Sequence, residues 1–288
     1  MNKLNLQKNA LGFEVWDDTR LITIYRAKEE LPRAESPKPC FAPIYTPGGG
    51  LVTEYRPADH PWHTGLYFGW VFANKVNLWG GPWYIPSKNR YEFVEGTHGV
   101  QQHDAFTRLE NSDTGIVTVE NLSWIDADER IMAREVRTYE IETLADFPGY
   151  RWNIHTRISA EGNPLELASS RKSHYSGLEL RMGPPFSDAN HRNSEGLIGH
   201  ENIMAQRARW VSAAGGAGGE VIMMDHPDNP RHPVTWFVRR NLMGAGLLME
   251  EDLVIETGQV LDLRYGFIVL DQPLSNNDIE KIYDCFSN

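Results

Sequence analysis

The stretch Tyr150-Arg-Trp-Asn-Ile-His-Thr-Arg-Ile158 indicates the fold most clearly. Every second residue from Trp152 to Ile158 is apolar or a threonine, and polar side chains alternate with them. This period of two is typical of a β-strand with one buried face and one solvated face, as in an antiparallel sheet.

Further runs rich in β-formers lie on both sides of this stretch. Gly115–Trp124 and Arg134–Glu142 precede it, although Val136, Tyr139 and Ile141 interleave with charges less regularly than the residues after Trp152 do. Gly65–Phe72 is an apolar, aromatic run of strand length, which predicts a buried strand. Other strands are predicted at residues 21–25, 221–224, 235–239, 246–250 and 260–269.

These runs predict an all-β chain of 288 residues, with two large packed antiparallel sheets. Hydrophobic residues make up 41% of the sequence, which is enough for a large core, and we expect a single β-sandwich domain over residues 1–288. Helical spacing occurs only near the C-terminus, over Asp278–Phe286, where Ile279, Ile282, Tyr283 and Phe286 share one face.

The formal net charge of −11 argues against non-specific attraction to nucleic acid or an anionic membrane. Cys40 and Cys285 are too few for a disulfide scaffold or a cysteine-based zinc site. The N-terminus has no apolar signal-peptide core, and no window reaches the roughly 18 apolar residues of a membrane span. We therefore expect a cytoplasmic protein with a small-molecule partner; a homo-oligomer is compatible with the sequence.

Two histidines, His60 and His63, lie close together in the stretch Glu54–Trp70. On an extended chain their spacing sends the two rings to opposite sides, but a bend at Pro61 can bring both to one cavity. Histidine suits acid–base chemistry near neutral pH, and the neighbouring Asp59 can orient an imidazole. Alternatively, these residues only cap a turn and stack on Trp62.

A second candidate group consists of His174, Glu179 and Arg181. If residues 177–182 form a strand, Glu179 and Arg181 point to the same face and can share a salt bridge or a polar pocket. The arginine fork can bind a carboxylate or polarise a sugar hydroxyl or carbonyl. A purely structural ion pair is equally compatible with the sequence.

Aromatic residues Trp79, Trp83 and Tyr84 lie in the Gly/Pro-rich segment Asn74–Asn89, which predicts an irregular loop. Their faces can stack on a pyranose ring, or they can cover an open end of the core. In the turn that follows Met224, Asp225 and Asp228 are expected to make hydrogen bonds that stabilise the turn.

Three histidines, His60, His63 and His174, can also bind a divalent metal in an open site. No HExxH or EF-hand pattern supports a metal, so we assign no metal ligands and the sequence requires no cofactor.

Several of these segments together resemble the bacterial DUF6807 family, in order from about residue 40 to residue 270. The matching segments are Asp59-His-Pro-Trp-His-Thr-Gly-Leu66, Leu78-Trp-Gly80, Gly177-Leu-Glu-Leu-Arg181 and Asp225-His-Pro-Asp-Asn-Pro230. Trp62 stands where the family usually has a histidine, and Thr64 where arginine is common. The family has been labelled methane oxygenase PmoA, but a membrane oxygenase needs spanning helices and none is predicted here.

The resemblance implies a galactose-mutarotase-like β-supersandwich and a role in carbohydrate catabolism. We therefore expect a carbohydrate-active enzyme, lyase-like, hydrolase-like or epimerase-like, acting on a sugar or an oxidised (keto) glycoside. A non-catalytic sugar-binding module and a metal-dependent enzyme remain alternatives. The expected catalytic residues are His60, His63, His174 and Arg181, and the expected substrate-binding residues are Asp59, Trp62, Tyr67, Trp79, Trp83 and Glu179.

Overall fold

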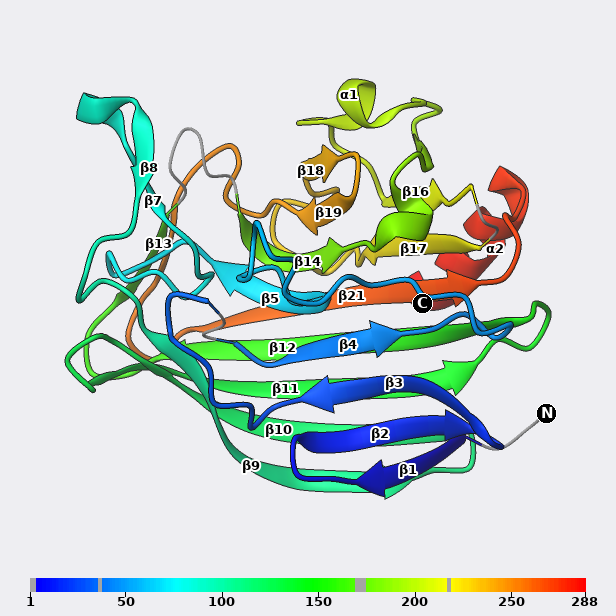
Figure 1. Ribbon diagram of the computed structural model, residues 1–288, viewed down its shortest axis with the longest axis horizontal. Coiled ribbons are helices and arrows are strands. Elements are labelled where there is room, and N and C mark those ends of the chain that lie inside the picture. The colour runs from blue at the N-terminus through cyan, green and yellow to red at the C-terminus, as the bar shows by residue number, and fades with distance from the viewer. Residues whose placement is uncertain (1–3, 36–37, 169–174, 217–218) are drawn as a thin grey trace.

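The computed structural model describes residues 4–35, 38–168, 175–216 and 219–288, and its main elements are two eight-stranded antiparallel sheets (Figure 1). The first sheet has the order β1 (Leu4–Lys8), β2 (Gly12–Asp17), β3 (Arg20–Arg26), β4 (Cys40–Ile44), β5 (Leu66–Trp70), β14 (Ser176–Arg181), β19 (Leu242–Ala245) and β18 (Trp236–Arg239). The second has the order β15 (Asn190–Asn193), β16 (Trp210–Ala214), β17 (Glu220–Asp225), β21 (Val260–Leu270), β12 (Gly149–Ala160), β11 (Ile131–Thr143), β10 (Gly115–Ile125) and β9 (Val100–Asn111).

Smaller elements surround these sheets. One sheet of three strands joins β20 (Leu253–Ile255), β13 (Leu165–Ala168) and β6 (Phe72–Ala73), and a hairpin joins β7 (Trp83–Ile85) to β8 (Arg90–Glu92). The helices are α1 (His200–Ile203), α2 (Asn276–Ser287) and the single 3-10 turns Pro86–Lys88 and Pro184–Phe186. The predicted all-β class with two large antiparallel sheets and a short C-terminal helix is confirmed.

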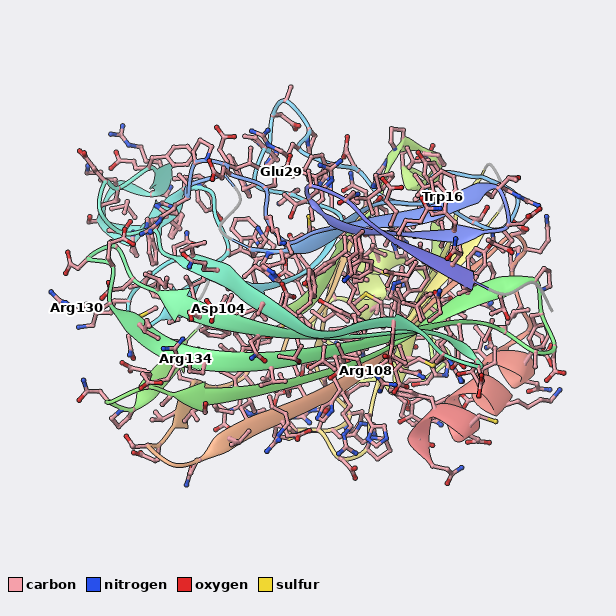
Figure 2. The ribbon with its side chains drawn as sticks, turned by 90° about the horizontal axis from the view of Figure 1, so that it is seen from below. Trp16, Glu29, Asp104, Arg108, Arg130 and Arg134 are labelled. Atoms are coloured by element: carbon pink, nitrogen blue, oxygen red, sulfur yellow. The ribbon has the colours of Figure 1, made fainter. Side chains whose placement is uncertain are left out.

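The main core lies between the two large sheets. Trp152 of β12 approaches Phe41 of β4 with ring centroids 6.3 Å apart, and Trp70 of β5 lies 5.7 Å from Trp124 of β10. Both pairs join one sheet to the other, and Figure 2 shows β1–β4 as a layer over β9–β12. Burial of such large rings dominates the hydrophobic stabilisation of a core.

Strand β11 differs from the expected pattern because two of its charges face inward. Val136 is 42% exposed, whereas Glu135 and Arg137 are buried. Nε of Arg137 donates to Oε1 of Glu135 over 2.6 Å, and the same carboxylate accepts hydrogen bonds from Trp124 and Thr156. These bonds compensate the cost of burying the charges, so apolar character alone does not set the inward face here.

The solvent face of the second sheet is polar where β9, β10 and β11 meet. Arg134 donates to the hydroxyl of Ser123 over 2.6 Å, and that hydroxyl donates to Asp104 over 2.5 Å. Asp104 and Arg134 lie on this outer layer (Figure 2). Helix α2 covers another part of the same sheet and packs Ile279, Ile282 and Tyr283 into a separate apolar cluster.

No helix in the described part of the chain is long and apolar enough to cross a membrane. The segment between β14 and β16 contains β15 and α1, neither of which the sequence predicts. Both elements are too short to produce a periodic sequence signal. The segment Asn74–Asn89, expected to be an irregular loop, likewise contains β7 and a 3-10 turn.

Candidate active site

A cavity of about 300 Å³ lies over the outer face of the first sheet. The alternation of β5 turns Leu66 and Phe68 into the main core and Tyr67 to this outer face, where it joins a second apolar cluster with Val71, the residue after the strand. Its lining residues are His60, Trp62, His63, Val71, Asn77, Trp79, Pro82, Tyr91 and Tyr175. Such a concave, mainly aromatic site with a few polar groups is typical of small-molecule binding.

A turn around Pro61 brings the two histidines together. The amide of His60 donates to the carbonyl of Pro57 over 3.0 Å, and the amide of His63 donates to the carbonyl of His60 over 3.0 Å. The two imidazole rings stack with centroids 5.2 Å apart and planes 20° apart. The bend therefore overrides the opposite orientations that an extended chain would give.

His63 is 5% exposed, and neither of its ring nitrogens has a hydrogen-bond partner among the described residues. Burial, followed by the positive charge of Arg181, lowers the pKa of His63 to about 2. The ring is therefore neutral at physiological pH, with one nitrogen able to donate and the other able to accept. A buried imidazole without partners is costly unless a ligand or water satisfies it.

His60 is more accessible, with 46% of its side chain exposed. Its Nδ1 lies 2.8 Å from Oδ2 of Asp59, and the hydrogen bond to His60 lowers the pKa of Asp59. A carboxylate at Nδ1 fixes the tautomer of a neutral imidazole and leaves Nε2 for proton exchange. Asp59 therefore holds the ring of His60 in the orientation that a general acid–base catalyst needs.

The aromatic wall of the cavity is built on Trp79. Its ring stacks on Tyr175 with centroids 4.2 Å apart and planes 18° apart, and Trp62 lies 6.3 Å away. Trp79 can lie close to the sheet because residue 69 is glycine: a Cβ at Gly69 would come within 2.4 Å of Cδ1 of Trp79. The glycine in the run Leu66–Trp70 therefore creates space for this wall.

Glu179 lies beneath this wall and does not line the cavity. Nε1 of Trp79 donates to Oε2 of Glu179 over 2.8 Å. This bond and the nearby Tyr67 both lower the pKa of Glu179. The Tyr67 hydroxyl has no hydrogen bond of regular geometry to any described residue. Burial is the larger effect and raises the pKa of Glu179 to about 7. The carboxyl group therefore changes its protonation state near neutral pH.

Lys38 is a residue that sequence reasoning missed. Its Nζ lies 3.1 Å from the carbonyl oxygen of Trp62, donates also to that of Trp79, and lies 4.3 Å from the ring centroid of Tyr67. Burial lowers the pKa of Lys38 to about 8, while the charge of Glu179 raises it. This one cation thus joins the two segments that carry the aromatic wall, and nothing in the sequence around it indicates that role.

Other predicted residues lie outside the cavity lining. Nε of Arg181 pairs with Oε2 of Glu54 over 3.0 Å, so the arginine takes part in an ion pair, but with Glu54 and not with Glu179. Trp83 donates to the hydroxyl of Thr97 over 2.6 Å and packs beside the wall. His174 lies outside the described residues. Conversely, sequence reasoning did not select Tyr91 or Tyr175, because isolated tyrosines carry no local signal.

In the turn after β17, Asp225 makes the expected stabilising hydrogen bonds, whereas the carboxylate of Asp228 accepts from Nη1 of Arg264 over 2.8 Å. Asp225 accepts hydrogen bonds from the side chains of Asn229 and His232 and from the amide of Val234.

No three His, Cys, Asp or Glu side chains within residues 4–35, 38–168, 175–216 and 219–288 are grouped to hold a metal.

Comparison with protein families matches residues 13–284 to a family described as "Family of unknown function (DUF6807)". The chain belongs to the DUF6807 family. No curated protein matches it.

Among solved structures, a heparan sulfate lyase HepC mutant from Pedobacter heparinus has a TM-score of 0.42 and 7% identity, covering 95% of this chain and 36% of that one. The GH36 α-galactosidase AgaB from Geobacillus stearothermophilus has a TM-score of 0.39 and 10% identity, covering 96% of this chain and 41% of that one. The chain thus spans well under half of either structure, and likenesses this distant say nothing about its ligand.

In this DUF6807 member, the motif Asp59–Leu66 forms the turn that carries both histidines. Gly65, which ends the turn, has a φ of +88°, and a Cβ there would lie 2.2 Å from the carbonyl oxygen of Phe41. Only glycine allows this backbone to approach β4 so closely. The motif therefore provides both the imidazoles and the glycine that positions them.

Proposed function

We propose that this DUF6807 member is a carbohydrate-active enzyme that uses His60 and His63 for acid–base chemistry on a sugar ring in the cavity. The observation that carries the proposal is His63: a buried, neutral imidazole whose nitrogens lack partners in the described chain and which lines an aromatic cavity. A sugar satisfies both features, because its hydroxyls bind the imidazole and its apolar face stacks on the rings.

The two histidines have different tasks in this proposal. His60, oriented by Asp59, takes the proton from the carbon next to the carbonyl of an oxidised (keto) sugar. The electron pair of that C–H bond forms an enolate, and the N–H of neutral His63 donates to its oxygen. Collapse of the enolate breaks the bond to the leaving group at the next carbon, and the protonated His60 returns the proton to that group. Protonation of the same enolate on its opposite face by water, with the protonated His60 then neutralising the hydroxide, would give epimerisation instead.

Deuterium exchange tests the first step directly. A 3-keto derivative of methyl glucoside is incubated with enzyme in D₂O, and NMR follows the loss of the proton next to the carbonyl. His60→Gln and His63→Gln should each slow the exchange by about 10² or more, the usual contribution of general acid–base catalysis. Exchange at the wild-type rate in both variants would remove the catalytic assignment.

The aromatic walls also fit a sugar-binding module without catalysis. Such a module would bind sugars in the wild type and in both variants, with neither exchange nor product formation. Metal analysis of protein purified without a tag addresses the metal-dependent alternative, since a stoichiometric divalent ion would assign the imidazoles to coordination.

A further inference from the structure

The hairpin β7–β8 projects from the body of the molecule beside the candidate active site (Figure 1). Tyr91 on β8 and Phe93 and Val94 just after it are 53%, 58% and 37% exposed. These three are among the nine large apolar side chains that are exposed in the described chain, and they lie within four consecutive residues. A concentration of exposed apolar side chains at a cavity edge indicates a contact surface.

A second hollow, of about 540 Å³, is lined by Phe93 and Val94 and does not include His60 or His63. The ring of Phe93 lies 5.9 Å from that of Trp62, which lines the first cavity, and 6.4 Å from that of His98, which lines the second hollow. Nε2 of His98 also makes a hydrogen bond of 2.8 Å to the carbonyl oxygen of Gly81, the residue before Pro82 of the first cavity. Trp62 and Phe93 therefore form the partition between two adjoining spaces.

The second hollow is amphipathic. Phe93 and Val94 form its apolar side, and Arg33 and Glu129 line it as a charged pair. The Nη2 of Arg33 contacts both carboxylate oxygens of Glu129, over 2.7 and 2.9 Å, and its Nη1 donates to the carbonyl of Asp126 over 3.0 Å. The Arg33 guanidinium and the Glu129 carboxylate, whose side chain is 70% exposed, offer donors and acceptors in the hollow that Phe93 also lines, and a sugar, with a hydroxyl edge and an apolar face, matches both.

From this arrangement we infer that the hollow is a second saccharide subsite and that the substrate carries at least two sugar rings. One ring occupies the histidine cavity, the second contacts Phe93, and the linkage between them passes the Trp62–Phe93 partition. The inference rests on the proposed function, because it places the first ring in the histidine cavity.

Calorimetric titration of the full chain tests the subsite with matched pairs of sugars: glucose against cellobiose and maltose, and galactose against lactose. At least one disaccharide should bind about tenfold more tightly than its monosaccharide, which is the contribution of one aromatic contact of roughly 1.4 kcal/mol. Phe93→Ala should abolish that difference and leave the monosaccharide affinity unchanged. Phe93→Trp should retain the difference, and Ile198→Ala, which truncates an exposed apolar residue elsewhere, should change nothing.

The possible failures are distinguishable. If a monosaccharide binds the wild type and no disaccharide binds more tightly, the subsite is wrong and the sugar cavity stands. If Phe93→Ala weakens monosaccharide and disaccharide equally, Phe93 belongs to the first cavity and the subsite is again overturned. If none of the five sugars binds the wild type, the subsite is overturned, whereas the proposed function is decided separately by the deuterium exchange of the keto glucoside.

Discussion

Nε1 of Trp79 donates a hydrogen bond of 2.8 Å to Oε2 of Glu179, so a wall of the candidate active site is fastened to a buried carboxyl group. Burial raises the pKa of that group from 4.5 to about 7, and its neighbour Lys38 has a pKa lowered to about 8. Both groups therefore titrate close to physiological pH, directly beneath the cavity.

Glu179→Gln should remove a pH dependence from the stability of the fold. Because the folded-state pKa is raised, the protonated form favours folding, and this contribution is lost as pH rises from 4.5 through about 7. The loss amounts to about 3 kcal/mol at 1.36 kcal/mol per pKa unit. Urea unfolding at pH 4.5 and 7.5 should show the free energies of wild type and variant diverging by that amount. Glu256→Gln, an exposed control, should follow the wild type; parallel curves for Glu179→Gln would contradict the prediction.

His63→Gln should have the opposite effect on acidification. The folded-state pKa of His63 is lowered from 6.5 to about 2, so the unfolded chain binds the extra proton and stability is lost as pH falls below 6.5. Between pH 6.5 and 4.5 the wild type should lose roughly 3 kcal/mol more than the variant. The measurement is the difference between the two pH curves of unfolding free energy, in which the contribution of Glu179 cancels. Equal acid sensitivity would show that His63 is protonated in the folded protein.

Lys38→Met should loosen the cavity as well as the fold. The substitution keeps the apolar stem but leaves the carbonyls of Trp62 and Trp79 without their donor, at roughly 1 to 3 kcal/mol for each buried group. We expect a loss of about 2 to 6 kcal/mol in chemical unfolding and weaker sugar binding. Lys75→Met, at an exposed lysine, is the control. A stable variant with unchanged binding would show that the lysine does not hold the wall.

Gly69→Ala should displace Trp79. The new Cβ would lie 2.4 Å from the indole, so the ring must move and its bond to Glu179 must weaken. Overpacking of this kind costs typically 1 to 3 kcal/mol, and sugar binding should fall with it. Gly216→Ala, where nothing lies within 4 Å of the new Cβ, should be neutral. Tryptophan fluorescence and calorimetry together report both effects; an unchanged indole signal would exclude the displacement.

The sequence predicted the strands better than the site. The alternation around Trp152 correctly predicted β12, and the four apolar residues near the C-terminus predicted α2, because periodic burial leaves a local pattern. The irregular alternation around Val136 was misleading, since Glu135 and Arg137 face inward and compensate one another.

The candidate site depends on contacts between distant segments. Lys38 reaches the carbonyl of Trp79 from 41 positions away, and Glu179 meets the same residue across 100 positions. No local pattern encodes such contacts. The pair of histidines was recognisable as a candidate, but whether the bend at Pro61 brought their rings together depended on the turn geometry.

The inward charges of β11 have a consequence for how the second sheet assembles. Side chains alternate along a strand, so a slip of one residue against β10 or β12 would turn Glu135 and Arg137 outward and Val136 inward. In that misaligned sheet, Trp124 and Thr156 would lose the carboxylate to which they donate. Purely apolar strands tolerate such slips more easily, because one aliphatic side chain replaces another. The buried ions therefore select one alignment of the longest strands during folding, and they do so even if an apolar replacement would be equally stable.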